Sequence, residues 1–166
     1  MTDKKSIGET VVSVVIRAIA AALTAIFFLP PLFAVSCEGS NELFEFTGLN
    51  TLVGKTITTA LGPQKVNGNF WAVFLLVIPV ALFLVIQLRR NLSFLTRAVF
   101  IISTALSFLG VGAFYLLSVV VAKQAQENLM TAMVSVWFWV SVGLYIGSGV
   151  VSLVSVFAFR RKKACT

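Results

Sequence analysis

The fold of this chain is decided by an uninterrupted apolar stretch, residues 98–122, which reads AVFIISTALSFLGVGAFYLLSVVVA. These 25 residues include no Asp, Glu, Lys or Arg. A helix of that length extends about 37 Å, since each residue adds about 1.5 Å, whereas the hydrocarbon core of a bilayer is about 30 Å thick. The stretch therefore predicts a transmembrane helix that is longer than the membrane requires.

Three other apolar stretches have the same character. We predict that residues 10–34, 70–88 and 129–159 also span the membrane, so the fold class is an all-α bundle of four transmembrane helices. The composition agrees, because 58% of the 166 residues are hydrophobic, 11% are charged and the mean hydropathy is +0.99. Soluble domains carry about 25% charged residues. We expect one membrane domain that covers residues 1–166.

The basic residues predict the orientation of the spans. Ten of the 13 lie before or early in the first span, in the second connection or in the tail: Lys4, Lys5, Arg17, Arg89, Arg90, Arg97, Arg160, Arg161, Lys162 and Lys163. Lys and Arg concentrate on the cytoplasmic side of membrane proteins. We therefore expect a multi-pass plasma-membrane protein with cytoplasmic N- and C-termini. Its cytoplasmic anchor would consist of Arg89, Arg90, Arg160, Arg161, Lys162 and Lys163.

The outer ends of the spans carry further signals. Pro30 and Pro31 should end or kink the first helix, because proline lacks a backbone N–H. Trp71, Trp137 and Trp139 fit an aromatic belt at the outer interface. The third and fourth helices exceed the bilayer, so we expect both to project outward and to meet at the polar turn 123–128. A signal peptide ending before a lipidated Cys37 is disfavoured, because the residues before this cysteine match such a motif poorly.

Residues 36–69 form the one sizeable extracytoplasmic segment. Residues 43–47 alternate polar and apolar side chains, which is typical of a half-buried strand, and residues 55–59 are β-branched enough to form a return strand. Gly48, Leu49 and Asn50 suit a turn between them. We predict a small β-hairpin-like cap that lies on the projecting helix ends. The residues that we expect to make extracytoplasmic contacts are Cys37, Phe44, Phe46 and Leu49.

The first loop carries a recognisable pattern, LPPLFAVSC at 29–37 followed by FTGL at 46–49 and by Gly54. It resembles small, uncharacterised bacterial four-helix membrane proteins with a Pro-x-Phe-x-Val-Ser-Cys run and a later Phe-Thr-Gly-Leu segment. The resemblance covers about 30 residues and implies a bacterial membrane protein without pointing to an activity. The layout is also similar to that of claudin-like tetraspans, by analogy of architecture only. The chain lacks their Trp-Gly-Leu-Trp motif and their paired loop cysteines.

The residue inventory argues against catalysis. The sequence contains no histidine, which removes the commonest general base and metal ligand. We expect no enzymatic activity, no cofactor and no metal, and no nucleic-acid partner either, since the net charge of +7 serves membrane topology. Cys37 and Cys165 should lie on opposite sides of the membrane and cannot pair within one chain. For Cys37, simple packing, an intermolecular disulfide, lipidation and redox work all remain open.

Small side chains recur at helical spacing on the third and fourth spans. They predict close helix packing, either inside the bundle or between chains, since small residues let helix backbones approach each other in lipid. The residues of this predicted packing or oligomer face are Gly143, Gly147, Ser148, Ser152, Ser103, Ser107 and Gly110.

These signals favour a non-enzymatic membrane interaction protein, a subunit or scaffold of a membrane assembly. Its partners would be the bilayer, a further copy of the chain or other membrane proteins. An oligomeric channel or facilitator, with the serines of the fourth span along its path, is the alternative. A membrane immunity protein that neutralises a toxin is a further alternative.

Overall fold

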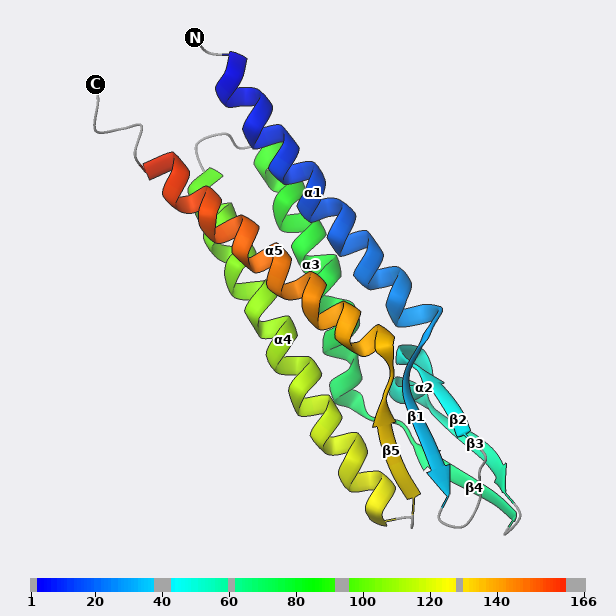
Figure 1. Ribbon diagram of the computed structural model, residues 1–166. Helices are drawn as coiled ribbons and strands as arrows, with labels where there is room; N and C mark the ends of the chain where they lie inside the picture. The colour runs from blue at the N-terminus through cyan, green and yellow to red at the C-terminus, as the bar shows by residue number, and fades with distance from the viewer. Residues whose placement is uncertain (1–2, 38–42, 60–61, 92–95, 128–129, 161–166) are drawn as a thin grey trace.

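The computed structural model describes residues 3–37, 43–59, 62–91, 96–127 and 130–160. Four long helices lie side by side in an up-and-down bundle (Figure 1), and α1 begins at the same end of the bundle at which α5 ends. Their bounds are α1 Asp3–Phe28, α3 Val73–Asn91, α4 Thr96–Glu127 and α5 Val136–Arg160. Strands and two short helical segments, α2 and η1, belong to the opposite end, where the strands form a cap.

The four helices are each long and apolar enough to cross a membrane, as the sequence predicted. The qualifying segments comprise 19, 19, 30 and 23 residues: Thr10–Phe28, Phe70–Leu88, Arg97–Gln126 and Val136–Ala158. The third segment is the longest, because α4 continues to Glu127 and runs alongside the cap. Pro79 lies inside α3.

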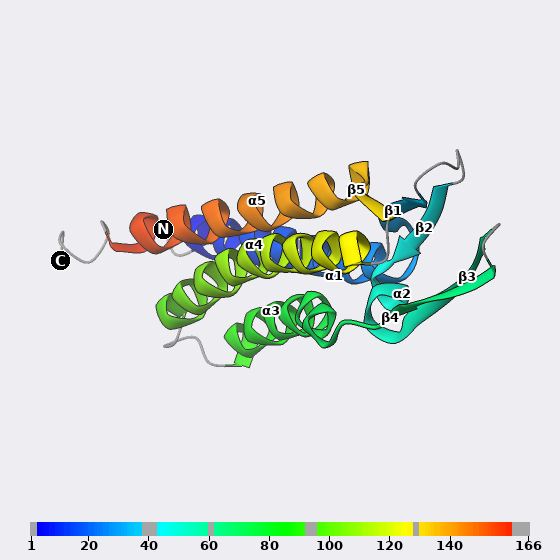
Figure 2. The same cartoon turned by 90° about the horizontal axis from the view of Figure 1, so that it is seen from below.

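The cap contains two small antiparallel sheets. The first joins three strands in the order β2-β1-β5, and the second is the hairpin β3-β4. In chain order the elements are β1 Pro31–Cys37, β2 Leu43–Thr47, α2 Gly48–Val53, β3 Gly54–Thr59, β4 Gly62–Asn67, η1 Phe70–Ala72 and β5 Met130–Val134. The hairpin extends away from the bundle beyond α2 (Figure 2).

The first helix ends earlier than predicted and the fourth begins later. We expected residues 10–34 to be helical, but α1 ends at Phe28 and Pro31–Cys37 forms β1. Pro30 and Pro31 explain the end, because neither can donate a backbone hydrogen bond to a preceding turn. We expected the fourth helix to start at 129, but Met130–Val134 forms β5, which pairs with β1 from Phe33↔Val134 to Cys37↔Met130.

The predicted hairpin is also wrong in its pairing. Both predicted strands exist, but β2 pairs with β1, and β3 pairs with β4. The predicted turn is instead the helix α2. Thr47 caps its first turn by accepting a hydrogen bond from the Asn50 N–H at 3.2 Å, and Gly54 ends it at a φ of 89°. A side-chain cap and a C-terminal glycine at positive φ are both helix-end signals.

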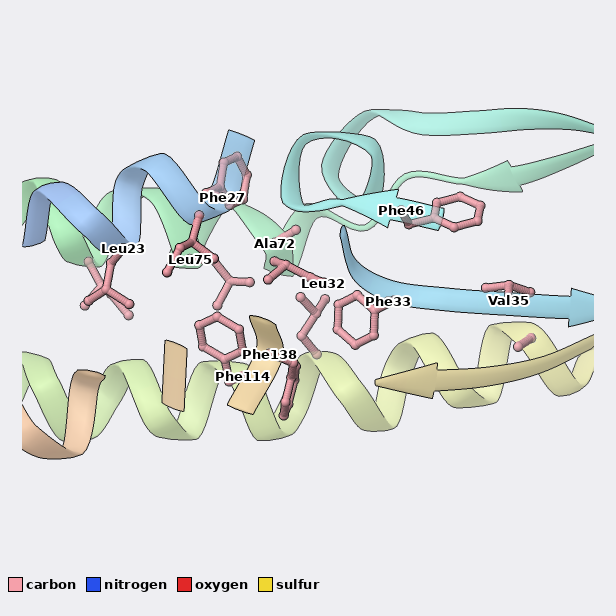
Figure 3. Packing of buried hydrophobic residues seen from close by; sticks show 14 of the residues in the cluster. Leu23, Phe27, Leu32, Phe33, Val35, Phe46, Ala72, Leu75, Phe114 and Phe138 are labelled. Carbon is pink, nitrogen blue, oxygen red and sulfur yellow. The ribbon is translucent and has the colours of Figure 1, made fainter. Parts of the chain in front are cut away.

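The main core joins the bundle to the cap. Leu23 and Phe27 of α1, Leu75 of α3 and Phe114 of α4 continue into Leu32, Phe33, Val35 and Phe46 of the sheet (Figure 3). The Phe138 ring lies with its centroid 5.1 Å from that of Phe114 and 5.6 Å from that of Phe33. A ring from α5 thus packs between α4 and β1. Such edge-on ring contacts add to the burial energy and tie the cap to the helices.

A second core lies nearer the other end of the bundle. It consists of the buried residues Ile16, Ala20, Leu82, Ile86, Val99 and Phe100 from α1, α3 and α4. On α1 and on α3 the two buried residues are four positions apart, so each of these helices turns one stripe toward its neighbours.

Candidate functional site

The predicted packing face divides into two parts in the structure. Four of its serines come together between α4 and α5 and form what we call the serine seam: Ser103, Ser107, Ser148 and Ser152. All four are fully buried. Ser107 Oγ lies 3.2 Å from Ser148 Oγ, which links the two helices. Ser103 Oγ donates to the Val99 carbonyl at 2.8 Å, the usual way in which a helical serine satisfies its hydroxyl.

Close packing continues along the same interface. Gly110 of α4 faces Tyr145 of α5, and a Cβ added at Gly110 would stand 2.4 Å from the tyrosine ring. Gly149 lies beside Ser107, where a Cβ would stand 3.3 Å from the serine Cβ. Small residues on one helix therefore leave room in which larger groups of the other helix pack. Among the described residues, the buried hydroxyls of Tyr145 and Ser152 have no hydrogen-bond partner.

The two glycines of the predicted GxxxG motif point elsewhere. Gly143 and Gly147 lie on the outward side of α5, and a Cβ added at either would meet no neighbouring element of the described residues within 4 Å. The residues around them on this face are exposed, with Trp139 at 62% and Val150 at 48%. The structure therefore separates this GxxxG face from the serine seam, although both were predicted as one packing surface.

The predicted cap contacts also differ from one another. Phe46 is buried, at 3% exposure, and packs in the core, so it presents no surface to a partner. Lys55 covers it with its ammonium group 5.6 Å from the ring centroid, and this group donates to the Glu45 carbonyl at 3.2 Å. Phe44 is half-buried, whereas Leu49 is exposed. The side chain of Cys37 lies outside the described part of the chain.

The structure contains a hollow under the cap that the sequence did not predict. It is small, with a cavity volume of about 30 Å³, and lies between the sheet, α2, β4 and the outer part of α4. Polar groups in its walls come from Thr51, Asn67 and Gln124. The other lining residues are apolar: Phe33, Val35, Phe46, Val66, Val121, Ala125 and Met130. No local pattern marks it, because it depends on the pairing of β5 with β1.

Basic residues occur at both ends of the molecule. Lys55 and Lys65 belong to the cap hairpin and Lys123 to the outer part of α4, whereas the described arginines belong to the part of the bundle away from the cap. Arg17 of α1 donates from Nη1 to Gln87 Oε1 of α3 at 3.1 Å and from Nε to the Ser13 carbonyl at 3.2 Å. This side chain therefore bridges two helices. Arg89, Arg90 and Arg160 belong to helix ends, and their side chains lie outside the described residues. The predicted anchor residues Arg161, Lys162 and Lys163 lie outside them altogether.

Comparison of the chain with protein-family models, with curated proteins and with solved structures found no match. The resemblance to bacterial four-helix proteins and the analogy with claudin-like tetraspans therefore stay predictions.

Proposed function

We propose that this chain is a multi-pass protein of the plasma membrane, with both termini cytoplasmic, that serves as a non-enzymatic subunit or scaffold of a membrane assembly. Support for the membrane location comes from the outer surface of the bundle. Large aliphatic side chains on three helices are more than half exposed, among them Leu84 at 56%, Leu109 at 62% and Val154 at 60%. Each would cost about 1 kcal/mol or more in water, at about 25 cal/mol per Å². Lipid removes that cost.

One observation supports association of this chain with another in the membrane: the open face at Gly143 and Gly147. In lipid, helices associate through close backbone contact and hydrogen bonds, since hydrocarbon offers no hydrophobic drive. Two glycines four residues apart create a shallow groove into which another helix fits. Because α5 already contacts α4 through the serine seam on its other side, this groove is free to receive a helix of a second chain.

The test replaces both glycines of this face. Gly143→Leu together with Gly147→Leu should fill the groove without disturbing the fold, because a Cβ added at either position would lie more than 4 Å from the other helices and strands that the structure describes. Native mass spectrometry in mild detergent should show an assembly for the wild type and the separated chain for the double variant. Gly112→Leu is the matched control, since Gly112 is likewise outward and open on α4. It should associate as the wild type does.

Two outcomes would contradict the proposal. The first is a wild-type chain that is strictly monomeric and co-purifies with no other protein. The second is an assembly that survives the double substitution unchanged. Energy-transfer measurements between labelled chains in liposomes check the same point in a bilayer.

A channel lined by the serines of α5 receives less support. Ser148 and Ser152 are buried against α4 and are therefore not on the outer surface from which an oligomer would build a pore. Solute flux into liposomes separates the two ideas, because a scaffold should conduct nothing.

A further inference from the structure

The most exposed large apolar side chains of the described residues lie in or next to four separate helices. They are Leu29 at 77%, Phe70 and Val136 at 75% and Val53 at 71%. Leu29 follows α1, Phe70 opens η1, Val136 opens α5 and Val53 ends α2. We call these four residues the apolar ring. Their exposed neighbours extend it: Phe28, Leu49, Trp71, Trp137 and Trp139.

Contacts place the members of the ring at one level, the junction of bundle and cap. Gly48 of α2 lies against Phe27, since a Cβ there would stand 2.4 Å from the phenyl ring. The Asn69 N–H, just before Phe70, donates to the Thr51 carbonyl of α2 at 2.8 Å. The Ser135 N–H, just before Val136, donates to the Leu32 carbonyl at 3.0 Å. Figure 1 shows α2 beside the end of α1.

On two of the helices, the spacing between this level and the arginines near the opposite end matches a bilayer. Along the chain, 19 residues separate Phe70 from Arg89, and 21 separate Trp139 from Arg160. At about 1.5 Å per residue these segments measure about 30 Å, the thickness of the hydrocarbon core. The ring therefore lies where the outer interface of the membrane would be, a zone in which tryptophan is enriched. The outer part of α4 and the strands stand beyond it.

The helix α2 contributes Val53 to the apolar ring. This is unexpected, because α2 belongs to the loop and does not span the bilayer. Its two faces differ: Gly48 and Thr51 are buried, whereas Leu49 and Val53 point outward. An exposed apolar face on a short helix in a water-filled loop would cost energy, but the same face is suited to the boundary between headgroups and acyl chains.

We propose that α2 lies in the outer interface of the bilayer, with Leu49 and Val53 in contact with lipid. This inference rests on the proposed membrane location. Its occupant is lipid because the exposed face of α2 lies between exposed apolar residues on both sides, Leu29 just after α1 and Phe70 before α3. The cap is thereby held against the membrane surface. The outward Leu49 then contacts lipid, where the sequence suggested an extracytoplasmic contact.

The test uses nitroxide labels in nanodiscs of phosphatidylcholine and phosphatidylglycerol. Each label is attached to a single introduced cysteine in a Cys37→Ser, Cys165→Ser background. The sites are Val53→Cys on α2, Leu109→Cys as an exposed site in the middle of α4, and Lys65→Cys as an exposed site on the hairpin. The measured quantity is the collision rate of each label with oxygen, which dissolves in lipid, relative to that with a water-soluble nickel chelate.

Oxygen collisions should prevail at Val53 and at Leu109, and nickel collisions at Lys65. A label at Val53 that behaves like the one at Lys65 overturns the inference while Leu109 still reports lipid. A label at Val53 that neither reagent reaches also overturns it, because α2 would then be covered by protein. If nickel prevails at Leu109 as well, the proposed membrane location itself has failed.

A second measurement avoids the cysteine substitutions. Leu49→Trp is made the sole tryptophan through Trp71→Phe, Trp137→Phe and Trp139→Phe. Lipids brominated near the headgroup should then quench its fluorescence more strongly than lipids brominated at the chain end. Fluorescence that no brominated lipid quenches overturns the inference.

Discussion

The contact between Gly110 and Tyr145 leads to a quantitative prediction for the α4–α5 interface. A Cβ added at Gly110 would stand 2.4, 2.5 and 2.7 Å from three carbons of the Tyr145 ring. Carbon atoms pack at about 3.5–4.0 Å, so the ring would have to move by about 1 Å. It has little room to do so, because it is fully buried and its centroid lies 5.9 Å from that of Phe114. Overpacking of this kind costs about 1–3 kcal/mol.

The change from glycine to alanine also raises helix propensity, by about 1 kcal/mol. Gly112→Ala on the same helix serves as the matched control, because it brings the same propensity gain and its Cβ would meet nothing within 4 Å. The free energies of unfolding of the two variants should therefore differ by about 2 kcal/mol, with Gly110→Ala the less stable. Unfolding in mixed micelles, followed by tryptophan fluorescence, measures this difference.

The cause of the cost can be checked with a double-mutant cycle. Shortening the ring through Tyr145→Leu should relieve the clash, so Gly110→Ala should cost less in that background. A Gly110→Ala variant as stable as Gly112→Ala would refute the close approach of α4 and α5. An equal cost in both backgrounds would mean that the ring is not its cause.

Two further predictions concern the start of α5 and the link between α1 and α3. Ser135 Oγ accepts a hydrogen bond from the Trp137 N–H at 3.2 Å and donates one to the Pro31 carbonyl, so Ser135→Ala should lower the free energy of unfolding by about 1–2 kcal/mol through the loss of both bonds. Unfolding that matches the wild type would show that the cap is not needed. Gln87→Leu removes the amide that accepts from Arg17 and should destabilise the bundle, whereas Gln126→Leu, at an exposed position near the end of α4, should not. Equal melting temperatures for these two variants would contradict the role of this link.

Local composition was sufficient for the four helices. A charge-free run such as 98–122 is compatible with few structures other than an apolar helix. This conclusion needs only the residues of the run itself. The strands over Leu43–Thr47 and Gly54–Thr59 were also visible, because alternation and β-branching are local signals. The sequence alone thus determined the number, character and approximate position of the long helices and two strands.

The tertiary structure decided which of these segments meet. Residues 130–134 are apolar enough to continue a helix, but they pair with β1, almost a hundred residues earlier in the chain. Neither segment by itself indicates the free energy that this pairing contributes. The same holds for α5, where Ser148 turns inward and Gly143 outward. Both are small, and only the position of α4 distinguishes them, because a helix buries whichever stripe its neighbour covers.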